Sequence, residues 1–146
     1  MDQKVSEYLT RNRVCVLTVT LSDNSLHSSA MHYSPAADFS ALYFSTDINS
    51  RKCLGLKDHQ STQAAVVIGF SETEWVTLQM SGTICIISDN ERLTPEAVAS
   101  IKAIHYSRHP ASAKFKDNPD TVFLEFTPTC YRYTDFNSHP PLFIEK

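Results

Sequence analysis

The stretch FSTDINSRK, residues 44–52, joins two predicted elements and carries the clearest chemical signal in the chain. It follows an apolar strand, passes through hydroxyl and Asx residues, and places Ser50, Arg51 and Lys52 at the start of a predicted helix. Backbone N–H groups and the helix dipole favour an anion at such a position. The guanidinium fork, the ammonium group and the hydroxyls of Ser50 and Thr46 are all suited to phosphate oxygens. The stretch therefore indicates a phosphate site built from side chains.

The alternative interpretation is a capped helix whose two basic residues are solvated. Cations at the start of a helix are unfavourable unless an anion is present, so this alternative leaves the placement of Arg51 and Lys52 unexplained. Taken alone, the stretch keeps both interpretations open.

The composition excludes two large classes of function. The chain has 146 residues, with 13 Lys+Arg against 16 Asp+Glu and a formal charge of −3. Its three glycines, Gly55, Gly69 and Gly82, are far apart, so neither a G-x-G-x-x-G motif nor a Walker loop can be written with them. A sequence pI of about 6.0 argues against nucleic acid as a partner, because nucleic-acid-binding proteins need a basic surface.

The length predicts a single domain over residues 1–146, large enough to bury a full core. Residues 1–13 carry charges and lack an apolar segment, and no apolar run approaches the ~18 residues needed to cross a bilayer. We therefore expect a cytoplasmic protein without membrane contact. The four cysteines stand singly, which predicts free thiols, with Cys15 and Cys85 as small core residues.

Apolar and β-branched segments predict a mainly β fold. Turn signals separate seven short predicted strands, at residues 14–20, 26–33, 41–44, 63–70, 75–87, 122–126 and 131–136. Small helices are predicted after Asp2, over 51–58, and from Pro95 to about His105 with Thr94 as N-cap. Many short strands with few helices favour a closed or partly closed antiparallel barrel.

Other catalytic patterns are weak. No G-x-S-x-G motif positions a nucleophile, which argues against a hydrolase of that kind. His105 and His109 stand four residues apart, but no third ligand is spaced nearby and no H-E-x-x-H motif is present, so we predict a solvated helix end and no metal site. His27 and His32 fall on one predicted strand and are expected at the surface or in a cleft.

Four short motifs resemble the FMN-binding split barrels related to pyridoxamine 5′-phosphate oxidase. LYFST (42–46) followed by SRK (50–52) is similar to the strand and phosphate clamp of that family, and AAVV (64–67) matches its next strand. HSSAM (27–31) resembles the strand that runs along the isoalloxazine ring. QMSG (79–82) resembles the polar strand that reaches the flavin across the dimer interface.

The resemblance implies an antiparallel six- to seven-stranded Greek-key split barrel that binds FMN as a homodimer, with the cofactor at the subunit interface. It names no catalytic side chain, and it assigns Thr77 and Gln79 to contacts from the partner subunit. The other residues that it implies for cofactor binding are Ser29, Ala30, Met31, Ser45, Thr46, Ser50, Arg51 and Lys52.

The chain also departs from that pattern. Ser29 and Ser34 stand where the oxidases carry an Arg and a Lys for the phosphate, and YRYTDF (131–136) replaces their Arg-rich substrate motif. We therefore expect a flavin-dependent oxidoreductase of unknown small-molecule substrate rather than the oxidase itself. Aromatic residues expected around the substrate are drawn from Tyr33, Trp75, Tyr106, Tyr131 and Tyr133.

Three alternatives remain open from the sequence. One is a flavin- or haem-binding module without turnover, in which His27, His32 or His105 would contact haem. Another is a reductase that uses a deazaflavin, whose longer tail would need further basic groups. The third is an interaction protein that has kept the barrel and lost the cofactor.

Overall fold

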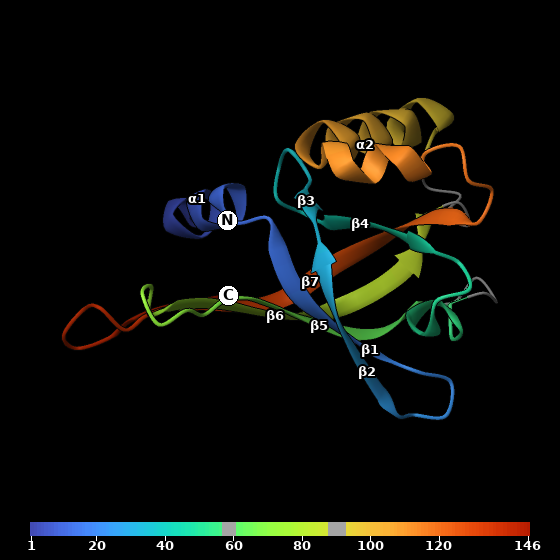
Figure 1. Cartoon of the computed structure of the whole chain (residues 1–146). Coiled ribbons are helices and arrows are strands. Elements are labelled where there is room, and N and C mark those ends of the chain that lie inside the picture. The colour runs from blue at the N-terminus through green and yellow to red at the C-terminus, as the bar shows by residue number, and fades with distance from the viewer. Residues whose placement is uncertain (57–60, 88–92) are drawn as a thin grey trace.

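The computed structural model describes residues 1–56, 61–87 and 93–146. The strands among these residues form one antiparallel sheet in the order β2-β1-β5-β6-β7-β4-β3, with β8 paired to β7, which confirms the predicted mainly β split barrel (Figure 1). The strands are β1 (Val14–Thr20), β2 (Leu26–His32), β3 (Ser34–Pro35), β4 (Leu42–Asp47), β5 (Thr62–Gly69), β6 (Val76–Ile86), β7 (Thr121–Asp135) and β8 (Leu142–Glu145). The helical elements are α1 (Gln3–Arg11), α2 (Pro95–Arg108), and the 3₁₀ turns η1 (Arg51–Cys53) and η3 (Pro110–Phe115).

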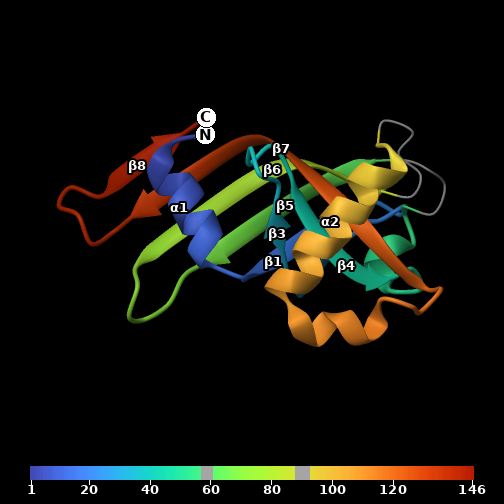
Figure 2. The same cartoon turned by 90° about the horizontal axis from the view of Figure 1, so that it is seen from above.

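The sheet is curled so that its two ends approach each other. β2 and β3 occupy opposite ends of the strand order, yet only Tyr33 separates them in the chain. β2 also contacts β4 and η1, which brings the two edges together along a line that we call the seam. Inward side chains such as Leu17, Val66 and Leu78 are fully buried and fill the space inside the curl. α2 lies over the β4 side of the sheet (Figures 1 and 2).

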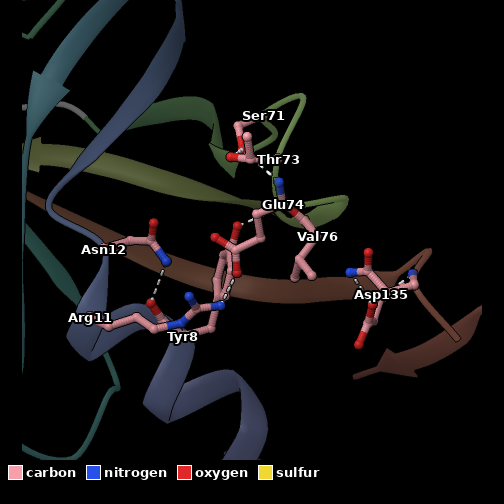
Figure 3. A network of polar contacts seen from close by, with 9 residues as sticks. Tyr8, Arg11, Asn12, Ser71, Thr73, Glu74, Val76 and Asp135 are labelled. Carbon is pink, nitrogen blue, oxygen red and sulfur yellow. Dashed lines mark hydrogen bonds and ion pairs between the residues drawn. The ribbon is translucent and has the colours of Figure 1, made fainter.

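The tips of the β5–β6 and β7–β8 hairpins extend away from the seam as an arm, with α1 beside it (Figure 2). Asp2 caps α1, and the buried face of the helix docks through Tyr8, whose hydroxyl donates to the Val76 carbonyl at 2.8 Å. Arg11 pairs with Glu74 across the same contact (Figure 3). Burial raises the pKa of Tyr8 to about 12. A Cβ on Gly69 would lie 2.1 Å from the Tyr8 hydroxyl, so only glycine allows this approach.

β7 corrects the prediction of two strands separated by Pro128. It runs unbroken over 15 residues, because a bulge opposite Ser81 and Gly82 absorbs one extra residue, Thr129. Proline lacks a backbone N–H, and a bulge is where a strand tolerates that loss. A Cβ on Gly82 would lie 2.1 Å from the Thr127 carbonyl oxygen, so the bulge also needs glycine across from it.

Smaller differences concern the ends of elements. Two elements were not among the predicted ones, namely the strand β8 near the C-terminus and the 3₁₀ turn η3 after α2. α2 continues three residues beyond the predicted end, to Arg108, and Pro110 follows its C-cap. The predicted helix over 51–58 is a 3₁₀ turn at 51–53, and residues 57–60 lie outside the described residues. None of the described helices is long and apolar enough to cross a membrane.

Candidate functional site

A cavity of about 340 Å³ opens at the seam, where the end of β2 meets the end of β4. α2 and η3 cover it from one side. Its walls are formed by Ala30, Met31, His32, Ser45, Thr46, Asp47, His105, Ser112, Phe115, Asn118 and Thr121. Two other cavities lie near α1 and β8 and contain none of the predicted cofactor residues. The seam cavity is therefore the candidate site.

One end of this site is made by Lys52, Thr46 and Ser50, which we call the cation end. Lys52 is only 9% exposed, and its Nζ donates to Thr46 Oγ1 at 3.1 Å. Thr46 Oγ1 lies 3.4 Å from Ser50 Oγ. No carboxylate of the described residues forms an ion pair with Lys52. Because a buried charge is stabilised by a counter-charge, the cation end has the chemistry of an anion-binding site.

The start of η1 contributes little to anion binding. η1 has only three residues, so a macrodipole contributes little there, and Ser50 makes no side-chain capping bond. Arg51 is exposed, whereas Lys52 is buried. The groups that favour an anion are therefore the buried lysine and its two hydroxyl neighbours, and not the start of a helix.

Ser29 supports the same interpretation from β2, which contacts η1. Its Oγ is buried and has no hydrogen-bond partner among the residues that the structure describes. A buried hydroxyl without a partner costs free energy, and such a group commonly marks a ligand or water position. A buried ammonium whose hydrogen-bond partner is a neutral hydroxyl has the chemistry to bind the oxygens of a phosphate group, so the residues of the cation end fit the phosphate of FMN. Ser29 is not among the cavity walls, and β2 brings it toward η1 only at the level of the two elements.

The other end of the site is made by His32, His105 and His109, which we call the imidazole end. His105 is 2% exposed and His109 is 7% exposed, so the prediction of a solvated helix end is wrong. Both rings are buried because the last turn of α2 packs against Tyr33 and Ser34. The ring centroid of His109 lies 4.8 Å from that of His105 and 4.9 Å from that of His32.

Hydrogen bonds fix the orientation of the two buried rings. His105 Nδ1 lies 2.9 Å from the hydroxyl of Ser34, which is itself 1% exposed. His109 Nε2 lies 2.8 Å from the Tyr33 carbonyl oxygen. A carbonyl only accepts, so His109 Nε2 carries a proton. Arg108 extends the anchoring, since it donates to the carbonyls of Leu9, Thr10 and Asn12 on the α1 side.

Burial disfavours the protonated form of two of these imidazoles, His105 and His109. Burial, followed by the positive neighbours His109, His32 and Arg108, lowers the pKa of His105 to about 4. Burial also lowers the pKa of His109, although its bond to the Tyr33 carbonyl acts in the opposite direction. The cavity walls therefore include His105, whose ring is neutral, and Thr46, which accepts a hydrogen bond from the buried Lys52.

The structure brings together some of the predicted cofactor residues and separates others. Ala30, Met31, Ser45 and Thr46 line the cavity, and Ser50 and Lys52 join it through Thr46. Thr77 and Gln79 belong to β6 and do not line this cavity.

Those two β6 residues face different surroundings. Gln79 is exposed, whereas Thr77 is 7% exposed and its hydroxyl donates to the Ile68 carbonyl at 3.3 Å. None of the tyrosines expected around a substrate lines the cavity, and neither does Trp75. Phe115 of η3 is the aromatic residue among its walls.

Sequence reasoning missed the contribution of α2 to the site. The four-residue spacing of His105 and His109 was visible, but their burial depends on α2 reaching Arg108 and on contact with residues far away in the chain. The sequence singled out Ser34 only as a position where the related oxidases carry a basic residue, and nothing there indicated its contact with His105. Among the described residues, no group of three or more His, Cys, Asp or Glu side chains is arranged to hold a metal ion. None of the four cysteines, all of which lie in the described residues, forms a disulfide bond, and burial raises the pKa of Cys15 to about 12.

Comparison with known proteins places these features in a family. The sequence profile described as pyridoxamine 5′-phosphate oxidase matches residues 1–135. Among curated proteins, no sequence match was found.

Several solved structures share the fold at low sequence identity. A haem-binding protein from Mycobacterium smegmatis has a TM-score of 0.74 and 13% identity; the alignment covers 100% of this chain and 58% of that protein. HutZ, the haem storage protein from Vibrio cholerae, has a TM-score of 0.69 and 11% identity over 87% of this chain and 89% of its own. A pyridoxamine 5′-phosphate oxidase-related FMN-binding protein from Nostoc punctiforme PCC 73102 has a TM-score of 0.70 and 15% identity over 98% and 93%.

Proposed function

The chain belongs to the pyridoxamine 5′-phosphate oxidase family, and on that premise we propose that it is an FMN-binding oxidoreductase whose phosphate site is centred on Lys52. The observation that carries the proposal is the cation end of the cavity. A lysine that is 9% exposed, bonded to a hydroxyl and without a carboxylate partner among the described residues, is stabilised when a phosphate binds.

Each residue of the cation end has a defined task in this proposal. Lys52 supplies the charge, Thr46 and Ser50 supply short hydrogen bonds, and Ser29 gains a partner for its buried hydroxyl. Arg51, which is exposed, adds a second charge as the site fills. The bound flavin supplies hydride chemistry, while the protein binds and orients it and keeps water from its ring. The substrate is a small molecule, and the changed C-terminal motif argues against pyridoxamine phosphate.

A homodimer with the cofactor at its interface completes the proposal. The outer face of the sheet carries an exposed cross-strand row in which Val16 pairs with Ala30 and Val67, and Val67 pairs with Gln79. Val16 and Val67 are 44% and 38% exposed. A two-fold contact over this row would cover its apolar side chains and bring Gln79 to the partner's site. Thr77, which already has a hydrogen-bond partner, is the weaker candidate for such a contact.

The test removes the charges of the phosphate site. In the variant Arg51→Ala/Lys52→Ala we expect FMN affinity, measured by quenching of flavin fluorescence, to fall at least a hundredfold, because charge-assisted hydrogen bonds contribute about 1.5–3 kcal/mol each. Lys102→Ala, which removes an exposed lysine of α2, is the matched control and should bind FMN like the wild type. Binding of FMN to the double variant at wild-type affinity would overturn the proposal.

A haem-binding module is the second candidate, and one observation favours it. His32 and His105 line the cavity, and His105 is in the neutral form that ligates iron, whereas His27 lies outside the cavity walls. The absorption spectrum of the purified protein separates the two candidates. Flavin gives two bands in the visible and near-ultraviolet range, and haem gives a Soret band.

A further inference from the structure

The 3₁₀ turn η3 covers one side of the seam cavity but takes little part in the core. None of its residues is buried, and Phe115 at its end is 49% exposed. Phe115 belongs to neither cluster of core side chains, yet it is one of the walls of the cavity. Core packing therefore does not explain why a large apolar ring stands at this position.

Hydrogen bonds nevertheless fix the backbone of Phe115. Its carbonyl oxygen accepts from the backbone N–H of Asn118 at 3.1 Å and from Oγ1 of Thr121 at 2.9 Å. At the other end of η3, the hydroxyl of Ser112 donates to the His109 carbonyl at 2.7 Å. The main chain therefore holds Phe115 in place, while its side chain keeps half of its surface exposed.

The segment that anchors Phe115 joins the sheet beside a residue of the cation end. In the register of β4 and β7, Thr46 pairs with Val122 and Asp47 pairs with Thr121. Thr121, whose hydroxyl holds the Phe115 carbonyl, is thus on the strand next to that of Thr46. Both Thr46 and Phe115 are walls of the same cavity. A ligand that fills this cavity meets both residues.

The walls of the cavity differ in chemistry from one element to the next. β4 contributes the polar residues 45–47, whereas Ala30 and Met31 of β2 are apolar. Phe115 is the only Phe, Tyr or Trp among the walls formed by the described residues. Lys114 Nζ lies 4.9 Å from the centroid of its ring, so a ligand meets this ring by its other face or by its edge. Walls of this mixed kind suit a flat aromatic ligand with polar groups along its edge.

We propose that Phe115 is a specificity-determining residue that packs against the planar ring of the ligand whose phosphate binds Lys52. This inference rests on the proposed function, because it takes FMN as that ligand. The isoalloxazine of FMN is a flat system of three fused rings with polar atoms along its edge. Contact between aromatic rings is favourable beyond the area that it buries, so Phe115 selects ligands with flat aromatic rings over ligands with aliphatic groups.

The first experiment measures the affinity for FMN by quenching of flavin fluorescence. In Phe115→Ala we expect the dissociation constant to rise about tenfold, because a stacking contact is lost. Phe115→Leu, which keeps apolar volume without an aromatic ring, should lie between this variant and the wild type. Ile104→Ala is the matched control, since it removes a side chain of α2 that is also 49% exposed but is not among the cavity walls. It should bind FMN like the wild type.

The second experiment detects contact with the ring itself, which a purely structural role would not produce. An indole in contact with an excited flavin transfers an electron to it and then takes the electron back, which quenches the flavin emission. In Phe115→Trp we therefore expect the fluorescence lifetime of bound FMN to be several times shorter than in the wild type. Ile104→Trp is the control and should leave this lifetime unchanged.

Thermal unfolding identifies any variant that fails to fold, and the variants Phe115→Leu and Phe115→Trp, which keep apolar bulk, then carry the comparison. If the wild type binds FMN, unchanged affinity in Phe115→Ala or an unchanged lifetime in Phe115→Trp overturns the inference alone. Failure of the wild type to bind FMN overturns the proposed function and the inference with it.

Discussion

The cation end and the imidazole end differ in how they hold buried ionisable side chains. Both remove ionisable side chains from water. Lys52 stays at the cation end with a hydroxyl for its partner, whereas His105 at the imidazole end gives up its charge. A lysine has an ordinary pKa near 10.4 and loses its proton only at great cost, while a histidine near 6.5 loses it easily. Among the described residues no carboxylate forms an ion pair with Lys52, whereas a neutral His105 needs no counter-charge.

We expect the largest effect from a substitution that removes the charge of Lys52. In Lys52→Met we expect the affinity for FMN to fall several hundredfold, because roughly 3–6 kcal/mol of charge-assisted hydrogen bonding is lost. The ligand-free protein should be as stable as the wild type or more stable, since a buried charge without a counterion is gone. Fluorescence titration and urea unfolding measure the two quantities. Loss of stability together with affinity would show that Lys52 has a counterion in the free protein.

Acid titration tests the imidazole end. The folded pKa of His105 is about 4, below the ordinary value of 6.5, so the unfolded chain binds the proton more readily. Stability should be fully present above pH 6.5 and should fall between pH 6.5 and 4 by up to about 3 kcal/mol, at 1.36 kcal/mol for each pH unit. Urea unfolding at pH 7.5 and 4.5 measures the loss. His105→Phe should show a smaller loss than the wild type, and an identical loss in both would contradict the neutral state of His105.

Ser34→Ala tests the hydrogen bond that orients His105, because it removes the partner of His105 Nδ1. A buried ring nitrogen would then lack its hydrogen-bond partner, which we expect to destabilise the protein by about 1–3 kcal/mol at pH 7.5. Ser107→Ala, an exposed serine of α2, serves as the control and should change stability by less than about 0.5 kcal/mol. No difference between the two variants in urea unfolding would mean that the ring turns to another acceptor.

The smallest effect is expected at Ser29. Its hydroxyl has no partner in the free protein, so Ser29→Ala should leave stability unchanged or raise it by about 1 kcal/mol or less. FMN binding should weaken by a few fold if this hydroxyl donates to the phosphate. Ser28→Ala, which changes the neighbouring exposed residue of β2, should not weaken it. Wild-type affinity in Ser29→Ala would remove Ser29 from the phosphate site.

The same two ends show what can be predicted from the sequence. Thr46, Ser50 and Lys52 lie within seven residues, so a strand followed by a turn brings them together by local geometry alone. His32, Ser34 and His105 come from β2, β3 and α2, and their contact depends on how far the sheet curls. Local patterns predicted the cation end, and only the tertiary fold reveals the imidazole end.

Among the strands, too, local sequence predicts some bounds, whereas others depend on residues far away in the chain. The bounds of β1 match the prediction residue for residue, because β-branched and apolar residues fill it from end to end. The sequence predicts two strands in place of β7, on either side of Pro128, since a proline in the middle of a strand ordinarily ends it. The bulge that tolerates Pro128 requires Gly82 on the neighbouring strand, a dependence between distant residues that no local pattern contains. The predicted homodimer and the individual cofactor contacts stay predictions.

The arm gives the protein an optical probe of its own. Trp75 is the only tryptophan, it is 53% exposed, and its indole N–H donates to the Glu72 carbonyl at 3.0 Å, which holds the ring in place. Phe70 and Phe136 flank that region, and α1 docks on the same hairpin through Tyr8. Tryptophan emission therefore monitors the hairpin tips and the docking of α1. If the proposed function holds, emission from bound flavin would report on the seam, so the two regions could be followed separately by fluorescence.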